Sequence, residues 1–323
     1  MLAYTARRLG SAALLVWIVL SGAFVLLHLA PGEPGVLYED PRITPEIRQE
    51  LRQLYGWDRP IHEQYLSWLG AAARGDWGVS FSRRQPAMGL LLAHVPATAL
   101  LVLTGVFLEH LLGILVGVWV ARRPGGWLDR QVQWISLVLY SVPAFVLGLF
   151  AIDVLAVRLG LFPPQHMTSA HWERLPPAQK VRDLLHHRAL PALVIGVRRF
   201  GAVVRFLRGG LIEALSQDYV LTARAKGLRE SRVLFVHALP NTLGPLIQRL
   251  GSSLPQLFAG TVILEVVFSW PGIGRLIYVS VLQRDYPVVL AGTALVAVLV
   301  VLCNLAADLF HAWLDPRVRD GLA

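Results

Sequence analysis

Six apolar stretches of membrane length constrain this chain more than any other feature of its sequence. A membrane-spanning helix needs about 20 mostly apolar residues, and each stretch approaches or exceeds that length. The composition agrees, because 55% of the residues are hydrophobic and only 16% are charged, whereas soluble domains average about 25% charged residues. We therefore predict an all-α, polytopic membrane protein. The six predicted transmembrane helices are Leu9–Ala30, Ala97–Ala121, Val132–Val157, Ala189–Leu207, Thr242–Ser269 and Pro287–Phe310.

The first apolar stretch follows Arg7 and Arg8, as the apolar core of a signal peptide would. It is longer than such a core, which has about 7–15 residues, and Ala30-Pro31-Gly32 makes a poor cleavage site. We therefore expect residues 1–30 to form a retained transmembrane helix.

The distribution of Lys and Arg favours one orientation in the membrane. Six spans place both termini on the same side, and the raw number of cations on the two sides is nearly equal. The cations are denser in the segments that lie inside when the termini are cytoplasmic, which favours that orientation. The net charge of +9 is then mostly juxtamembrane arginine facing anionic lipid and partner subunits, so nucleic acid is not implied as a partner.

A segment between the first two spans, residues 31–95, is amphipathic and predicts a small external helical subdomain. Thr44-Pro45-Glu46 is typical of a helix start, and a second helix should run from Pro60 to the glycine-rich turn at residues 74–78. This subdomain is either a platform for a substrate-delivering partner or a structural lid, and the sequence does not choose between them.

The second external segment, Arg158–Arg188, is rich in proline and histidine. Neutral imidazole is a good ligand for nickel and zinc, so a metal contact has to be considered. The spacing matches no known site and no cysteine or paired carboxylate completes one, so we favour surface histidines and predict no metal site. The histidines are His166, His171, His186 and His187.

A polar, Arg-rich stretch, Asp218–Asn241, is stranded between two apolar runs and predicts a helix-turn-helix docking surface. Its small residues would let the backbone of a partner approach closely, while its cations bind carboxylates. The alternative is a merely solvated basic loop. The candidate docking residues are Asp218, Tyr219, Ala223, Arg224, Ala225, Lys226, Gly227, Pro240 and Asn241.

These residues resemble the cytoplasmic coupling loop of ATP-binding-cassette (ABC) importers, a helix of the form A-A/R-A-x-G followed by a Pro-Asn type break. Further segments, in the same order along the chain, resemble the permease subunits of dipeptide, oligopeptide and nickel importers, specifically the first of their two paired permeases. They are Tyr4–Leu9, Ala30–Pro34, Tyr55–Pro60, Arg74–Ser80, Ser141–Pro143, Phe268–Arg275, Arg284–Pro287 and Leu314–Arg319.

The resemblance implies a type I ABC importer fold, with a five-helix core permease domain at residues 96–323 and a coupling loop at 209–241. It implies four kinds of partner besides the lipid bilayer and a location in the inner or plasma membrane of a bacterium. This chain would bind no cofactor, since ATP and Mg²⁺ are used by partner subunits. Those partners are a homologous second permease, two ABC ATPases and an external substrate-binding protein.

Ionisable side chains inside a span are costly and are functional candidates by default. Arg198 and Arg199 lie midway along the fourth span and should line a water-filled path or pair with acidic residues of other spans. They form either a cationic collar for the carboxylate of a substrate or a structural ion pair, and both remain open. The possible acidic partners are Glu109, Asp153 and Glu265; the candidate translocation residues are Arg198, Arg199, Glu109 and Glu265.

Sequence motifs give no support to an enzyme. The chain has no G-x-x-x-x-G-K-[ST], H-E-x-x-H, G-x-S-x-G or C-x-x-C-H pattern, so no catalytic residue is predicted. We expect a permease subunit that forms half of a translocation pore for di- or oligopeptides. Import of nickel or a metal chelate is the alternative, and a receptor or scaffold that transports nothing is a third hypothesis.

Overall fold

The computed structural model describes residues 2–30, 44–244, 246 and 260–314. Every element of regular secondary structure within these ranges is a helix. The α-helices are α1 (Leu2–Leu29), α2 (Pro45–Tyr55), α3 (Ile61–Ala73), α4 (Ala87–Ala121), α5 (Trp127–Ser141), α6 (Ala144–Ala151), α7 (Pro177–Leu215), α8 (Asp218–Ala225), α9 (Glu230–Arg232), α11 (Val262–Val267), α12 (Ile273–Leu282) and α13 (Tyr286–Leu314). Two π-helical segments, η2 (Ile152–Arg158) and η4 (Val233–Ala238), and a short 3₁₀ helix, η3 (Trp172–Arg174), complete the set.

The chain divides into two compact units. Unit 1 comprises Met1–Thr98, Pro271–Leu302 and Arg319–Ala323, and unit 2 comprises Ala99–Trp270 and Cys303–Val318. The domain boundaries expected after residues 30 and 95 stay predictions. Residues 31–43, residues 245 and 247–259 of the expected fifth span, and the segment 315–319 lie outside the described residues.

Three helices in the described part of the chain are long and apolar enough to cross a membrane. They are the Gly10–Leu29 part of α1, the whole of α4 and the Tyr286–Ala307 part of α13. A bent pair of helices passes the same test when taken together and makes a fourth. The number of six spans stays a prediction.

The third expected span, Val132–Val157, is not one continuous helix, so that prediction is wrong in detail. Its two halves, α5 and α6 with η2, meet at a bend of 103°. Pro143 has no N–H, and its ring pushes the preceding residue out of the helical region. Val142 is accordingly extended, with φ −71° and ψ 130°. The sequence Ser141-Val142-Pro143 is therefore a corner.

In unit 1, α2 and α3 confirm the two helices predicted for the external segment. Thr44 accepts a hydrogen bond from the backbone N–H of Ile47, and Pro45 occupies the first turn of α2. A hydrogen bond from the Thr44 side chain to the Glu46 carboxylate lowers the pKa of Glu46, and a backbone hydrogen bond at Glu46 itself lowers it further. Gly56 ends α2 in the left-handed conformation, with φ 69°.

A buried carboxylate fastens the loop after α3 to the start of α13. Asp285 is fully buried and accepts hydrogen bonds from the hydroxyls of Ser80 and Ser82 and from the backbone N–H groups of Phe81 and Ser82. A Cβ on Gly78 would lie 3.4 Å from the Cβ of Pro287, so the two segments pack directly against each other. Two segments that the sequence shows far apart thus form one contact.

The helix α4 begins at Ala87, ten residues before the predicted start of the second span. Pro96 lies inside it, although proline removes a helical hydrogen bond. The extra turns are held by packing, because Ala87, Leu90 and Leu91 belong to a buried apolar cluster in unit 1 with α12 and α13. Tertiary burial therefore outweighs the local preference of the proline.

In unit 2, both α4 and α5 pack against α7; α4 runs parallel to α7, and α5 runs antiparallel to it. Along α4, Gly105, Gly113 and Gly117 face Ile195, Val203 and Leu207 in turn, so α4 and α7 run parallel. A Cβ on Gly113 would lie 2.4 Å from the Cβ of Val203, so only glycine permits this approach.

The helix α7 begins earlier in the chain than predicted, because it starts at Pro177 inside the segment expected to be an external loop. Pro177 suits the first helical turn, where its missing N–H has no partner to lose. The expected fourth span, Ala189–Leu207, is the middle of this 39-residue helix.

Candidate functional site

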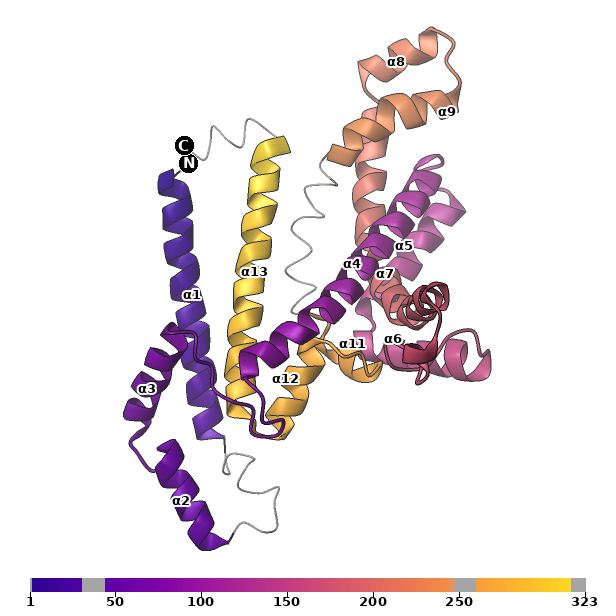
Figure 1. The fold of residues 1–323 in the computed structure, drawn as a ribbon. Coiled ribbons are helices and arrows are strands. Elements are labelled where there is room, and N and C mark those ends of the chain that lie inside the picture. Colours follow the sequence, from indigo (N-terminus) through magenta and orange to yellow (C-terminus); the bar gives the residue numbers. More distant parts are fainter. Residues whose placement is uncertain (1, 31–43, 245, 247–259, 315–323) are drawn as a thin grey trace. The chain divides into compact units, whose positions relative to one another are not determined.

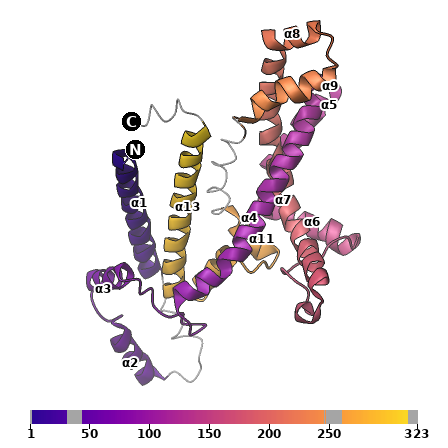
Figure 2. The same cartoon turned by 45° about the horizontal axis from the view of Figure 1, so that its top comes forward.

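The stretch predicted as a helix-turn-helix forms a compact hairpin of α8, α9 and η4, which we call the polar hairpin (residues 218–241). It lies at the carboxyl end of α7 (Figure 1), and Figure 2 shows the same arrangement from another side. Val220, Ala223 and Val233 are buried between its two arms. The predicted local structure is therefore confirmed.

The turn of the hairpin depends on Gly227. Its φ of 77° lies in the left-handed region, where residues with a Cβ are strained. The N–H of Gly227 donates to the carbonyl of Arg224, and the N–H of Leu228 donates to the carbonyl of Ala223, which together end α8. A Cβ on Gly227 would meet nothing within 4 Å, so the backbone conformation selects glycine here.

The candidate docking residues separate into inward- and outward-facing groups. Ala223 is buried in the hairpin, so its small size serves the hairpin's own packing. Ala225, Lys226 and Gly227 are exposed, and 41% of Tyr219 is exposed. Asp218 lies in the first turn of α8, with its backbone carbonyl accepting from the Thr222 hydroxyl.

Arg224 is engaged within the hairpin. Its Nε lies 2.7 Å and its Nη2 3.3 Å from the two carboxylate oxygens of Glu230. The pair closes the turn from the outside and fixes α9 against α8. Because both side chains are partly exposed, at 38% and 70%, a carboxylate of a partner can compete with Glu230 for this guanidinium.

The expected break at Pro240 and Asn241 is absent, and the helical conformation continues from residue 239 to residue 244. The preceding turn, η4, is π-helical, with the N–H of Leu239 bonded to the carbonyl of Leu234. In an α-helix the ring of Pro240 would clash with the carbonyl four residues before it. The wider π turn relieves that clash. Asn241 donates from Nδ2 to the carbonyl of His237.

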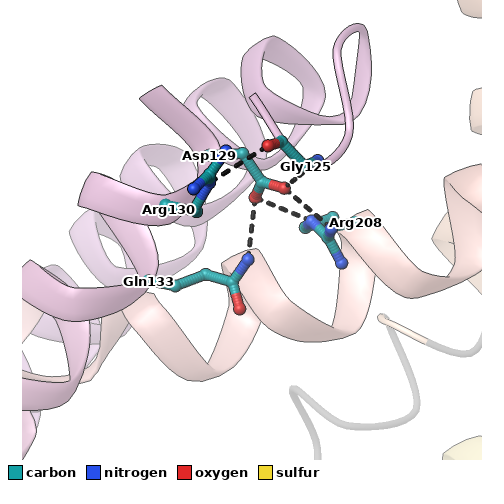
Figure 3. Close-up of polar contacts among 5 residues, drawn as sticks. All are labelled: Gly125, Asp129, Arg130, Gln133 and Arg208. Carbon is teal, nitrogen blue, oxygen red and sulfur yellow. Dashed lines mark hydrogen bonds and ion pairs between the residues drawn. The ribbon is translucent and has the colours of Figure 1, made fainter. Parts of the chain in front are cut away.

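A buried ion pair fixes α5 to α7 two turns before α7 ends. Both oxygens of the Asp129 carboxylate accept from Arg208, from Nε and Nη2, each at 2.7 Å (Figure 3). The same carboxylate accepts from the N–H of Gly125 and from Nε2 of Gln133. The Asp129 side chain is fully buried, so these four donors replace water entirely. We call this set the Asp129 network.

The Asp129 network joins α7 and α5 to the turn between α4 and α5, and the polar hairpin contacts the same turn. Gly125 belongs to that turn, and Arg122 from the same turn lies 5.7 Å from the ring of Phe235 in η4. The hairpin, the end of α7 and the start of α5 are thus joined by polar and cation–π contacts. The sequence alone did not predict this connection, because Asp129 and Arg208 are 79 residues apart along the chain.

Two further arginines of α7 contact α5 or its carboxyl end. Arg205 donates from Nη1 to the Ser136 hydroxyl at 3.2 Å, and Arg198 donates from Nε to the Val142 carbonyl at 3.3 Å. Arg198 also lies 5.6 Å from the ring of Tyr140. It therefore caps the carboxyl end of α5 at the corner, where the helix dipole favours a cation.

The expected pairing of Arg199 with Glu109 is present. Arg199 Nε lies 3.3 Å from Glu109 Oε2, and only 4% of the glutamate side chain is exposed. That oxygen accepts no well-aligned hydrogen bond among the described residues, so the contact is an ion pair by distance only. The neighbouring His110 buries an Nε2 that likewise finds no hydrogen-bond partner there.

The two other acidic candidates lie elsewhere. Asp153 pairs with Arg158 at 2.8 Å on an exposed surface, and Glu265 is fully buried in α11. Arg198 pairs with none of the three carboxylates proposed for it. The structure therefore brings together Arg199 and Glu109, and leaves Arg198 at the corner of α5.

The external histidines do not converge. His186 contacts the carbonyl of Leu161, and His187 contacts the carbonyl of Asp183. Among the described residues, no group of three or more His, Cys, Asp or Glu side chains is placed to hold a metal ion.

Long apolar helices together with a polar hairpin define a multi-spanning membrane protein with a structured polar extension. A family model, "Binding-protein-dependent transport system inner membrane component", matches residues 113–320, and the model of its N-terminal region matches residues 1–102. The chain belongs to this family. It is therefore a multi-pass inner-membrane component of a transport system that contains other subunits.

Curated relatives match along the full length of the chain. The oligopeptide transport system permease protein AppB of Bacillus subtilis is 40% identical, covering 99% of this chain and all of AppB. The di/tripeptide transport system permease protein DppB of Pseudomonas aeruginosa is 36% identical, covering 99% of both chains. The glutathione transport system permease protein GsiC of Escherichia coli K12 is 32% identical, covering 99% of both.

A solved structure shows the fold. A chain of the MetNI methionine ABC transporter, in an inward-facing conformation, superposes with a TM-score of 0.52 at 20% identity. The match covers 71% of this chain and 98% of that chain. The fold is therefore that of an ABC-transporter permease, as expected from the sequence.

Proposed function

We propose that this chain is the permease subunit of an ATP-driven importer of di- or oligopeptides and forms half of its translocation pore. The observation that carries the proposal is the 40% identity to an oligopeptide permease over its entire length. The other relatives cited are also named for peptides or for glutathione, itself a tripeptide. Import of nickel has less support, since none of these names refers to a metal.

The proposed assembly contains a homologous second permease, two ABC ATPases and an external substrate-binding protein. This chain does no bond chemistry and holds no cofactor of its own; ATP and Mg²⁺ act in the ATPase subunits. Both termini face the cytoplasm of a bacterium, in keeping with the denser Lys and Arg of the inside segments.

In this mechanism the polar hairpin is the contact with an ATPase subunit. Its exposed tip carries Ala225, Lys226 and Gly227, which suit close approach of a backbone and binding of a carboxylate. Movement of the ATPases displaces the hairpin, and the hairpin is joined to α7 and, through the Asp129 network, to α5. A loop transmits only what its contacts distinguish between two states, so these contacts set the coupling.

In the translocation path, Arg199 and Glu109 form an ion pair. A zwitterionic peptide can replace this pair with its own contacts to each of the two side chains. The carboxylate of the cargo takes the place of Glu109 beside Arg199, while the loosely aligned Glu109 receives the ammonium group. Because their 3.3 Å contact lacks hydrogen-bond alignment, opening it costs less than opening the Asp129 network. Arg198 and Glu265 are assigned to the same path with less geometric support.

Uptake by the co-purified complex in proteoliposomes tests the function. ATP is enclosed, and a pool of di- and oligopeptides is offered in parallel with a nickel chelate. We expect peptide accumulation, reduced by Arg199→Gln more for free peptides than for amidated ones. Accumulation of nickel alone would overturn the peptide assignment, and an equal effect of the substitution on both peptide sets would overturn the role of Arg199.

A further inference from the structure

The proposed transport mechanism does not use a groove that lies between α5 and α7. Its volume is about 470 Å³, and it is lined by one stripe of α5 together with one arginine of α7. The stripe follows helical spacing, so its side chains share one face. The lining residues are Arg130, Gln133, Trp134, Leu137, Tyr140 and Arg205.

The groove has a cationic part and an apolar part. Arg130 and Arg205 are both exposed, and each makes one hydrogen bond to a neutral acceptor, the Gly125 carbonyl and the Ser136 hydroxyl respectively. Neither guanidinium has an anionic partner among the described residues. Further along α5, Trp134 is 64% and Leu137 is 48% exposed. The groove thus offers two unneutralised cations beside an open apolar surface.

The walls of the groove are held in place. A Cβ on Gly201 would lie 2.2 Å from the Cβ of Ser136, so α5 and α7 cross in close contact beside Arg205. The Asp129 network fastens the same two helices at Arg208, three residues after Arg205, whereas Gly201 lies four residues before Arg205. Arg205 is one turn from Gly201 on the same face of α7. The position of its charge is therefore built into the helix crossing.

The chemistry of the lining selects among occupants. A peptide would bring backbone N–H and carbonyl groups along its whole length that need partners, and Nε2 of Gln133 already donates to Asp129. An amphiphile with one anionic head and a hydrocarbon tail needs no more than two cations and an apolar track. Basic pockets between transmembrane helices bind acidic lipid headgroups in this way.

We propose that the α5–α7 groove is a binding site for an acidic phospholipid. The phosphate lies between Arg130 and Arg205, and one acyl chain runs along Trp134, Leu137 and Tyr140. A bound lipid of this kind neutralises charges that would otherwise face hydrocarbon, where an unpaired arginine is costly. It also stabilises the crossing of α5 and α7, and with it the helix that carries the polar hairpin.

The test uses the complete importer in nanodiscs of phosphatidylcholine with a minor fraction of phosphatidylglycerol. Lipid retained after gentle delipidation is counted by native mass spectrometry. We expect the wild type to retain phosphatidylglycerol, with apparent affinity falling about fivefold for Arg130→Gln or Arg205→Gln and about 25-fold for both. Arg182→Gln is the matched control, because Arg182 is exposed on α7 and does not line the groove.

A second measurement needs no change of charge. Brominated lipids quench the fluorescence of a tryptophan that they touch, and the contribution of Trp134 is the difference between the wild type and Trp134→Phe. We expect brominated phosphatidylglycerol to quench this contribution more strongly than brominated phosphatidylcholine does.

Three results would overturn the proposal. Equal retention by the wild type and the double variant would leave the arginines without a role. Absence of quenching by either lipid would assign the groove to the interface with the second permease subunit. Displacement of the bound lipid by a transported peptide would assign it to the cargo.

Discussion

Removal of Arg208 should destabilise the chain far more than removal of Arg205, the preceding arginine of α7. Arg208→Ala deletes two hydrogen bonds of 2.7 Å to a carboxylate whose side chain is fully buried. Breaking a buried ion pair from one side costs about 3–5 kcal/mol, because a charge is left without compensation. Arg205→Ala removes one hydrogen bond to a neutral hydroxyl from an exposed position, and should cost at most about 1 kcal/mol.

The pair should also respond asymmetrically. Asp129→Ala leaves Arg208, which is 24% exposed and can turn toward water or lipid phosphate, so its cost from the lost ion pair should be smaller. The double substitution should cost less than the sum of the two single ones. The free energy of unfolding of the purified full chain in mixed micelles, titrated with SDS and followed by circular dichroism, measures all four values. Equal costs for Arg208→Ala and Arg205→Ala, or strict additivity in the cycle, would refute this reasoning.

Three further predictions follow from particular contacts. Gly227→Trp should uncouple ATP hydrolysis from peptide uptake in the reconstituted complex, whereas Gly75→Trp, at a glycine with a similar φ and equally open surroundings, should carry the same backbone strain without uncoupling; equal transport by the two variants would contradict the docking role. Asp285→Ala should lower the free energy of unfolding by about 3 kcal/mol or more, because four donors from residues 80–82 lose a buried acceptor; Asp76→Ala, at an exposed carboxylate with one such bond, is the control, and similar losses would count against the argument. Because hydrogen bonding lowers the pKa of Glu46 from 4.5, its contribution to the stability of α2 should be present above that value and disappear as the pH falls through the lowered pKa; in a carboxyl-carbon NMR titration, Thr44→Val should move the Glu46 midpoint upward, and an unchanged midpoint would rule out the cap as the cause.

Local rules predicted those features whose cause lies within a few residues. The start of α2 at Thr44, the end of α3 before Gly75 and the hairpin turn at Gly227 all follow from capping and turn preferences. The length and apolar character of α1, α4 and α13 follow from composition alone. The same rules mark Pro143 as a place where a helix can end, but a corner of 103° depends on what packs on either side.

Predictions failed where tertiary contacts compensate for a local cost. Pro96 and Pro240 both lie within helical segments, because packing around the first turns of α4 and a π turn before Pro240 make up for the missing hydrogen bond. The candidate docking residues were predicted only in part, because the sequence does not show which of them the fold buries. Ala223 was selected as a small residue for a partner, yet it is buried inside the hairpin, and only the fold distinguishes these two uses of a small side chain.

The sequence by itself determined that this chain lies in a membrane, that it is helical, and that a polar hairpin interrupts its apolar helices. These properties depend on composition, on periodicity and on short motifs, all of which are local. Only the tertiary structure decided which polar groups meet: Arg208 with Asp129, Arg199 with Glu109, and Asp285 with the serines that follow α3. Each of these pairs joins segments far apart along the chain, and burial in a low-dielectric interior makes the choice of partner strict. Because no local rule links such residues, their pairing is a property of the fold.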